Sequence, residues 1–77
     1  MGKGPQQEYL KQFGKHLKSV REAKGISQRS LATSCNVDHS HISKIERGEK
    51  NITILTILEL ANALEVKPKK LLDFEID

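Results

Sequence analysis

Apolar residues recur along this chain every three to four positions, which is the period of an amphipathic α-helix. In the first third they form one stripe, made of Tyr9, Leu10, Phe13, Leu17 and Val20. Lysines occupy the opposite face, and Gly25 follows where a left-handed residue commonly ends a helix. The pattern predicts a first helix from near Gln7 to Lys24.

Two shorter helices are predicted next, separated by about three residues. Ser27 offers a side-chain oxygen as the N-cap of a helix from Gln28 to Ser34. Asp38 offers the same to a helix from His39 to Arg47. Asn36 lies between them, and asparagine is among the few residues that tolerate a positive φ, so it is the expected pivot of the turn. This spacing is typical of a helix-turn-helix.

The last third of the chain predicts a fourth and a fifth helix. Thr53 is the expected N-cap of the fourth, and Pro68 opens the fifth, where its missing N–H costs nothing. The wide apolar face of the fourth helix is formed by Ile54, Ile57, Leu58, Leu60, Ala61 and Leu64. No segment has the period-two alternation of a strand. We therefore expect an all-α, compact five-helix domain, residues 7–77, after a disordered segment, residues 1–6.

The composition limits what such a domain does. The chain has 77 residues, of which 36% are hydrophobic, and so small a domain has no room for a large substrate cavity beside its core. No run approaches the length of about 18 apolar residues that spans a membrane, and the first residues lack the apolar segment of a secretory signal. The single cysteine, Cys35, excludes an internal disulfide and fits a reducing compartment. We expect a cytoplasmic protein.

Charge is unevenly distributed along the chain. Residues 1–50 hold ten Lys or Arg against five Asp or Glu, a net of +5, whereas residues 51–77 hold three against five, a net of −2. A basic region followed by an acidic one favours an anionic partner, and nucleic acid is the usual partner of that kind. A solvated surface of uneven charge is the alternative interpretation.

The expected third helix has one aliphatic and one polar face. Ile42 and Ile45 fall on one side of it. An arc of about 140° on the other side holds His39, Ser40, Ser43, Lys44 and Arg47, and no carboxylate. Such a face suits the DNA major groove, whose floor presents hydrogen-bond donors and acceptors and whose walls are phosphates. An ordinary solvated helix face is the alternative.

Several motifs agree in register between about Leu17 and Leu72. They are Leu17-xx-Val20-Arg21-xx-Lys24-Gly25, Ser27-Gln28-Arg29-Ser30-Leu31-Ala32, Val37, Ile42-Ser43-Lys44-Ile45-Glu46-Arg47-Gly48 and Leu60-Ala61-x-Ala63-Leu64-x-Val66. Together they resemble the phage-repressor/Cro-like (XRE-type) helix-turn-helix DNA-binding family. The resemblance implies a lambda-repressor-like domain whose third helix lies in the major groove, and a homodimer on a palindromic operator. It implies a sequence-specific double-stranded DNA-binding transcriptional regulator and no enzyme activity.

The resemblance also implies roles for individual residues. The base-reading positions are His39, Ser40, Ser43 and Lys44. The positions that contact DNA phosphates are Ser27, Gln28, Arg47, Lys50 and Asn51. Arg21 and Glu46 match a structural ion pair that joins the first helix to the third. Glu65 departs from the family pattern, because glycine or asparagine is frequent near the end of the fourth helix.

A self-association surface is expected at the other end of the chain. Leu55 points about 160° away from Ile57 and hence off the core stripe. Phe74 and Ile76 add apolar residues in the tail. We interpret Leu55, Phe74 and Ile76 as a homodimer interface. A protein-interaction module, such as an antitoxin or adaptor, is the rival function. For Leu55 the alternative is that it is one isolated exposed leucine, which needs no explanation.

A metal site is conceivable at Cys35, His39 and His41. The two histidines are two residues apart, so on a helix they point about 200° from each other. No further cysteine or paired histidine completes four ligands. We therefore expect no metal, no cofactor and no small-molecule ligand, and we interpret Cys35 as a small packed residue.

Overall fold

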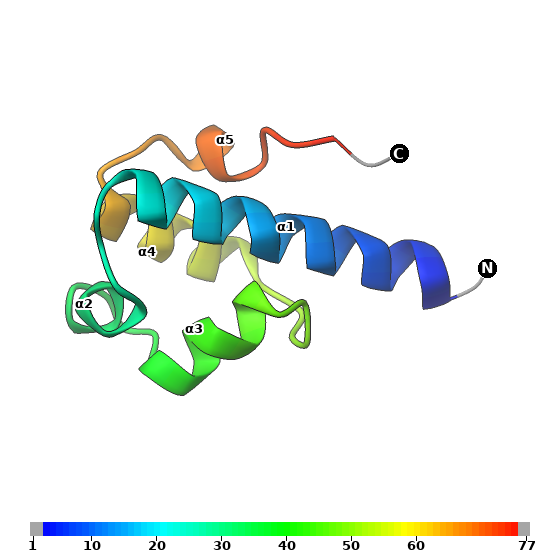
Figure 1. Ribbon diagram of the computed structural model, residues 1–77, viewed down its shortest axis with the longest axis horizontal. Helices are drawn as coiled ribbons and strands as arrows, with labels where there is room; N and C mark the ends of the chain where they lie inside the picture. Colours follow the sequence, from blue (N-terminus) through cyan, green and yellow to red (C-terminus); the bar gives the residue numbers. More distant parts are fainter. Residues whose placement is uncertain (1–2, 76–77) are drawn as a thin grey trace.

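The computed structural model describes residues 3–75, which form five α-helices and no strand (Figure 1). The helices are α1 (Lys3–Ala23), α2 (Gln28–Thr33), α3 (His39–Glu46), α4 (Ile54–Leu64) and α5 (Pro68–Leu71). The expectation of an all-α domain with five helices is thus confirmed. α2 and α3 each end one residue before the predicted position, which is within the ordinary ambiguity of helix ends.

α1 begins at Lys3 rather than near Gln7. Pro5 lies in the first helical turn, where backbone N–H groups have no intrahelical partner, so its missing N–H does not break the helix. Residues 3–6 are therefore helical where we expected disorder. The rest of that expected segment, Met1 and Gly2, lies outside the described residues.

The beginnings of α2 and α4 are capped by side chains as predicted. Ser27 Oγ accepts a hydrogen bond from the Ser30 N–H at 3.0 Å, and Thr53 Oγ1 accepts one from the Thr56 N–H at 3.1 Å. Asp38 stands at the N-cap position of α3, but its carboxylate makes no capping hydrogen bond among the described residues. The predicted position of that helix start is right, and the predicted bond is wrong.

α3 ends in a Schellman turn, in which two backbone bonds close the last helical turn around a left-handed residue. The Gly48 N–H donates to the Ile45 carbonyl at 3.0 Å, and the Glu49 N–H donates to the Lys44 carbonyl at 2.9 Å. Gly48 has a φ of 76°, which a residue without a Cβ adopts freely. The chain therefore reverses direction directly after α3.

α1 and α4 end in turns of the same kind. Gly25 closes α1 with a φ of 71°, as the sequence predicted, and Glu65 closes α4 with a φ of 58°. Glu65 thus adopts a left-handed conformation at the position where the resemblance implied glycine or asparagine. Asn36 is not one of the described residues that have a positive φ, so its predicted role as a left-handed pivot is wrong.

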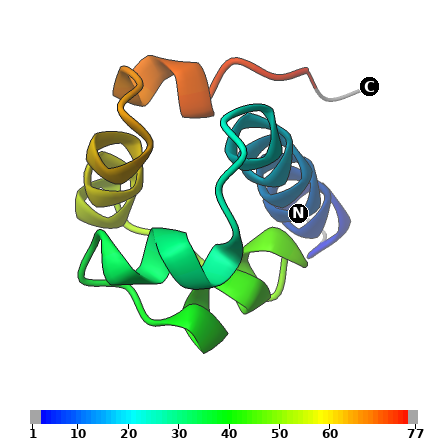
Figure 2. The same cartoon turned by 60° about the vertical axis from the view of Figure 1, so that its left-hand side comes forward.

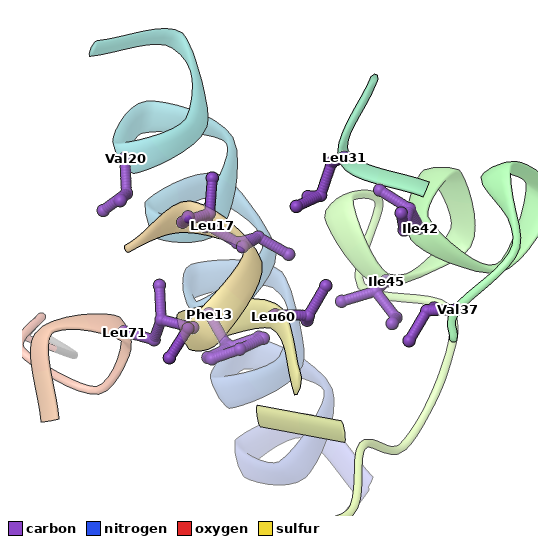
Figure 3. Packing of buried hydrophobic residues seen from close by; sticks show 11 residues of the cluster. Phe13, Leu17, Val20, Leu31, Val37, Ile42, Ile45, Leu60 and Leu71 are labelled. Carbon is purple, nitrogen blue, oxygen red and sulfur yellow. The ribbon is translucent and has the colours of Figure 1, made fainter. Parts of the chain in front are cut away.

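The five helices enclose one apolar core (Figure 3). Figure 2 shows α1 and α4 on opposite sides of it, with α5 at one end and α2 and α3 at the other. The large side chains that are fully buried in this core are Leu17, Leu31, Ile42, Ile45, Leu60, Leu64 and Leu71. Within residues 3–75, no helix has both the length and the hydropathy that crossing a membrane requires.

Three residues of the predicted apolar stripes are exposed instead. Tyr9, near the start of α1, is 58% exposed. Ile54 and Leu58 lie on α4, where the other helices cover only part of its wide apolar face. Helical periodicity identifies an apolar face, whereas the neighbouring elements decide how much of it is covered.

Candidate nucleic-acid interface

α3 is fixed to the domain by its aliphatic face. Ile42 and Ile45 are fully buried, together with Leu31 from α2, and Val37 from the intervening turn is also buried (Figure 3). This is the orientation that the sequence predicted. The opposite face of α3 consequently points to solvent.

The exposed face of α3 carries the predicted base-reading residues. His39, Ser40 and Lys44 are exposed, and Ser43 is half-buried. Glu46, the acidic residue of α3, is buried on the other side. The structure therefore places small polar and cationic groups together on one open helix face, which is chemistry that matches the major groove.

A buried ion pair connects α1 to the end of α3. Arg21 is 7% exposed and Glu46 is 8% exposed. Arg21 donates from Nε to Glu46 Oε2 at 2.7 Å and from Nη2 to Oε1 at 3.0 Å, and its Nη1 donates to the Ile26 carbonyl at 2.8 Å. The hydrogen bond to Glu46 raises the pKa of Arg21. A charged, two-pronged contact of this kind sets the orientation of α3 against α1.

Gln28 has a role at this ion pair that the sequence analysis missed. Its side-chain Nε2 donates to Glu46 Oε1 at 2.8 Å, so α2 is tied to the same carboxylate. The side chain is half-buried and reaches the surface at the start of α2. Because the amide carries a second N–H, this contact is compatible with the phosphate contact that we predicted.

Gly14 is a second residue that positions α3 and that the sequence analysis missed. A Cβ at Gly14 would lie 2.5 Å from the backbone oxygens of both Ile45 and Glu46. α1 therefore approaches the backbone of α3 at a distance that only glycine permits. The available signal was a glycine inside a predicted helix, which commonly has a packing reason.

The loop after α3 contains three of the predicted phosphate-contacting residues. Lys50 and Asn51 are exposed. Arg47 is also at the surface, but it donates from Nε and Nη2 to Glu49 at 3.0 and 3.1 Å, and from Nη1 to Ser43 Oγ at 2.6 Å. The hydrogen bonds between Arg47 and Glu49 raise the pKa of Arg47 and lower the pKa of Glu49. The sequence analysis did not anticipate that Arg47 has an acidic partner.

The predicted dimer residues have different outcomes. Leu55 is 71% exposed, as its helical phase indicated, and it lies beside Ile54 and Leu58 on α4, which are 75% and 40% exposed. We call Ile54, Leu55 and Leu58 the α4 patch. Ile76 lies outside the described residues. The sequence pattern did not separate Ile54 and Leu58 from the core, because both fall on its apolar arc.

We expected Phe74 to be exposed, but the structure places it half-buried. Its ring packs edge-on against Phe13, with centroids 6.2 Å apart, and lies 5.7 Å from the ring of His16. His16 Nε2 also donates to the Lys70 carbonyl at 2.7 Å. The tail therefore folds back onto α1, where Phe74 packs against the apolar core. Phe74 is thus half-buried rather than fully exposed, and its place in a dimer interface stays a prediction.

The described residues contain no side-chain cluster with the geometry of a metal site. Among them, no three His, Cys, Asp or Glu side chains are placed to hold an ion. Cys35 is half-buried, packs against the core, and donates from Sγ to the Leu31 carbonyl at 3.2 Å. Its position agrees with that of a small packed residue of the turn.

An aliphatic-faced α3 that follows α2 after a short turn, with its polar face open, defines a helix-turn-helix DNA-binding protein. The family model HTH_3, described as Helix-turn-helix, matches residues 17–71, and the chain belongs to this family. The resemblance drawn from the motifs is thereby confirmed. The family consists of DNA-binding transcriptional regulators rather than enzymes.

Several relatives of the chain are named as control proteins. The chain is 41% identical over 63 residues to control protein C.BamHI of Bacillus amyloliquefaciens, covering 80% of this chain and 78% of the relative. It is 34% identical over 60 residues to control protein C.SmaI of Serratia marcescens, covering 78% and 71%. The crystal structure of the restriction-modification controller protein C.AhdI from Aeromonas hydrophila is similar with a TM-score of 0.78 and 42% identity, covering 80% and 94%.

Proposed function

We propose that this protein is a sequence-specific regulator of transcription that binds double-stranded DNA in the cytoplasm as a homodimer, with α3 in the major groove of a palindromic operator. One observation carries the proposal. α3 buries its aliphatic face and its carboxylate, and it exposes His39, Ser40 and Lys44. A helix presented in this way has polar groups to offer to base edges and no negative charge toward the phosphates.

The DNA contacts divide into two groups. Base edges are read by His39, Ser40, Ser43 and Lys44. Phosphates are held by Ser27, Gln28, Arg47, Lys50 and Asn51, which lie at the start of α2 and in the loop after α3. Lys44 is the best candidate to donate to guanine O6 and N7, the commonest target of a lysine in the major groove.

A homodimer supplies the specificity that one short helix lacks. Two copies related by a two-fold axis place their α3 helices about 34 Å apart, on successive major grooves of one DNA face. The α4 patch offers the apolar surface for such pairing. In Figures 1 and 2, α3 lies at one edge of the domain and α4 lies between α3 and α5, so pairing through α4 leaves α3 uncovered.

Selection of bound duplexes from a random pool, followed by sequencing, tests this function. We expect two inverted half-sites whose centres are about 10 base pairs apart. The affinity should fall linearly with salt on logarithmic axes, because Lys and Arg contacts release counterions. A selected pool without sequence preference, or binding that does not depend on salt, would contradict the proposal.

The genes under control are those of a restriction–modification system. This context is supported by the relatives C.BamHI and C.SmaI, which are named control proteins, and by the C.AhdI structure, described as a restriction-modification controller. The selected operator should then lie upstream of adjoining methyltransferase and endonuclease genes. An operator found beside unrelated genes only would point to another regulatory context.

A further inference from the structure

Glu49 holds the one predicted phosphate-contacting arginine in a two-pronged contact. Its Oε2 accepts from Arg47 Nε at 3.0 Å and its Oε1 accepts from Nη2 at 3.1 Å. This arrangement, two parallel N–H···O bonds on a planar guanidinium, is also the arrangement in which arginine binds a phosphate. Glu49 therefore occupies the part of Arg47 that a DNA phosphate would use.

The Schellman turn is the reason that these two residues meet. Gly48 reverses the chain with a φ of 76°, and the Glu49 N–H returns to the Lys44 carbonyl at 2.9 Å. Glu49 is thereby brought back beside the last turn of α3, within reach of the guanidinium of Arg47. The carboxylate is placed by the backbone and not only by a flexible side chain.

The ion pair is exposed enough to exchange partners. The side chains of Arg47 and Glu49 are each 53% exposed. An exposed pair of this kind adds little to folding stability, because water and salt compete with it. A phosphate that is held in place beside Arg47 can consequently replace Glu49 at small cost.

We propose that Glu49 is a specificity-determining residue that acts through Arg47, by withholding the charge of Arg47 from DNA on which α3 is not seated. The inference rests on the proposed function. On random DNA the Arg47–Glu49 pair is neutral and contributes little attraction. On the operator, α3 enters the groove and brings a phosphate to Arg47, which then exchanges Glu49 for that phosphate.

Ser43 connects this exchange to base reading. Arg47 Nη1 donates to Ser43 Oγ at 2.6 Å, and this contact does not involve Glu49. Arg47 can therefore keep its contact with the hydroxyl while the Nε and Nη2 N–H groups that bind Glu49 change partner. The operator complex retains an ordered Ser43, and removal of Glu49 should affect random DNA more than the operator.

A double-mutant cycle tests the inference. Affinities for a random-sequence duplex and for the selected operator are measured over a series of salt concentrations with the parent, Glu49→Gln, Arg47→Gln and the double variant. Glu49→Gln should bind random DNA several-fold more tightly, with a salt slope steeper by up to about 0.9, the contribution of one phosphate contact. Its operator affinity should change less, so the ratio of the two affinities falls. In the Arg47→Gln background, Glu49→Gln should have no such effect.

Asp38→Asn is the matched control, because Asp38 is an exposed carboxylate at the opposite end of α3. Its effect on random DNA should be the same with and without Arg47. An equal gain from Glu49→Gln in both backgrounds would mean that Glu49 acts as a bare negative charge, and would overturn the inference alone; so would the absence of any gain. Parent binding that does not depend on salt would overturn the proposed function and the inference together.

Discussion

Lys44 and Lys50 are exposed lysines a few residues apart, yet one lies on the polar face of α3 and the other in the loop that follows it. Lys44→Ala should weaken binding to the preferred site by about 1–3 kcal/mol and relax the preference at one or two base pairs. Lys50→Ala should weaken binding to all sequences alike and reduce the salt slope by about 0.9. Dissociation constants on the operator and on its single-base-pair variants distinguish the two. An unchanged selected sequence with Lys44→Ala would contradict the base-reading assignment.

The buried pair of Arg21 and Glu46 leads to a second prediction. Arg21→Met leaves a buried carboxylate with Gln28 as its remaining side-chain donor, and Glu46→Leu leaves a buried guanidinium bonded to the Ile26 carbonyl. Each single change should cost about 3 kcal/mol of folding free energy, and the double change should cost less than their sum. Urea unfolding of the parent, both single variants and the double variant measures this. Single variants as stable as the parent would mean that the pair contributes nothing.

The limits of sequence prediction at the residue scale lie in side-chain partners. Arg21 and Glu46 were predicted to pair only because the motifs resemble a known family, since 25 positions separate them and no local pattern connects them. The contacts of Glu49 and Gln28 depend on the rotamers of both partners and on the turns that carry them. Composition and periodicity contain no information about either.

At the scale of the elements, local signals predicted most helix ends. Ser27, Thr53, Gly25 and Gly48 act at the expected positions because capping and left-handed turns are properties of a few neighbouring residues. In the turn between α2 and α3, the conformation of Asn36 was predicted wrongly for a long-range reason. The Asn36 N–H donates to Glu59 Oε1 of α4 at 3.2 Å, so another helix holds this turn without a left-handed asparagine.

The close approach of α1 and α3 is an element-scale feature that a substitution can test. Gly14→Ala places a methyl group against the Ile45 and Glu46 backbone oxygens, so α3 must move away from α1. We expect a loss of about 1–3 kcal/mol in folding free energy and a weaker affinity of the remaining folded protein for its operator. Thermal unfolding and binding below the melting range provide the two measurements.

Gly25→Ala is the matched control for that experiment. Apart from Gly25 and its two chain neighbours, no heavy atom of the described residues lies within 4 Å of the added methyl group, but the φ of 71° remains unfavourable for alanine. Its cost of about 1 kcal/mol should therefore leave operator affinity unchanged. If Gly14→Ala also left that affinity unchanged, the contact would matter for stability and not for the position of α3.

At the scale of the whole molecule, the sequence did not determine which apolar side chains the folded domain covers. The sequence predicted the buried residues of α3 correctly, because its aliphatic face is narrow. It predicted the exposure of Leu55 but not that of Ile54 and Leu58, nor the docking of Phe74, because these depend on where the tail and the other helices come to rest. Solvent exposure is a property of the assembled domain.

The α4 patch should mediate dimerisation. Leu55→Glu combined with Leu58→Glu introduces charge into the patch and should give folded monomers that bind the palindrome much more weakly. Sedimentation measures the association state, and circular dichroism confirms the fold. Leu72→Glu, at a leucine that is also exposed but lies after α5, should remain dimeric. A parent that sediments as a monomer both free and on the operator would refute the interface.

Substitution of Glu65 alone should raise the melting temperature of the domain. An L-residue in the left-handed conformation costs about 1 kcal/mol, and a domain of this size has only a few kcal/mol of stability in total. Glu65→Gly should therefore raise the melting temperature by about 4–8 °C, as followed by calorimetry. Glu65→Ala keeps the Cβ and removes the carboxylate, so it should give no gain, and an equal gain would locate the cost in the charge. The turn after α4 is thus a position at which one substitution can raise the melting temperature of the domain.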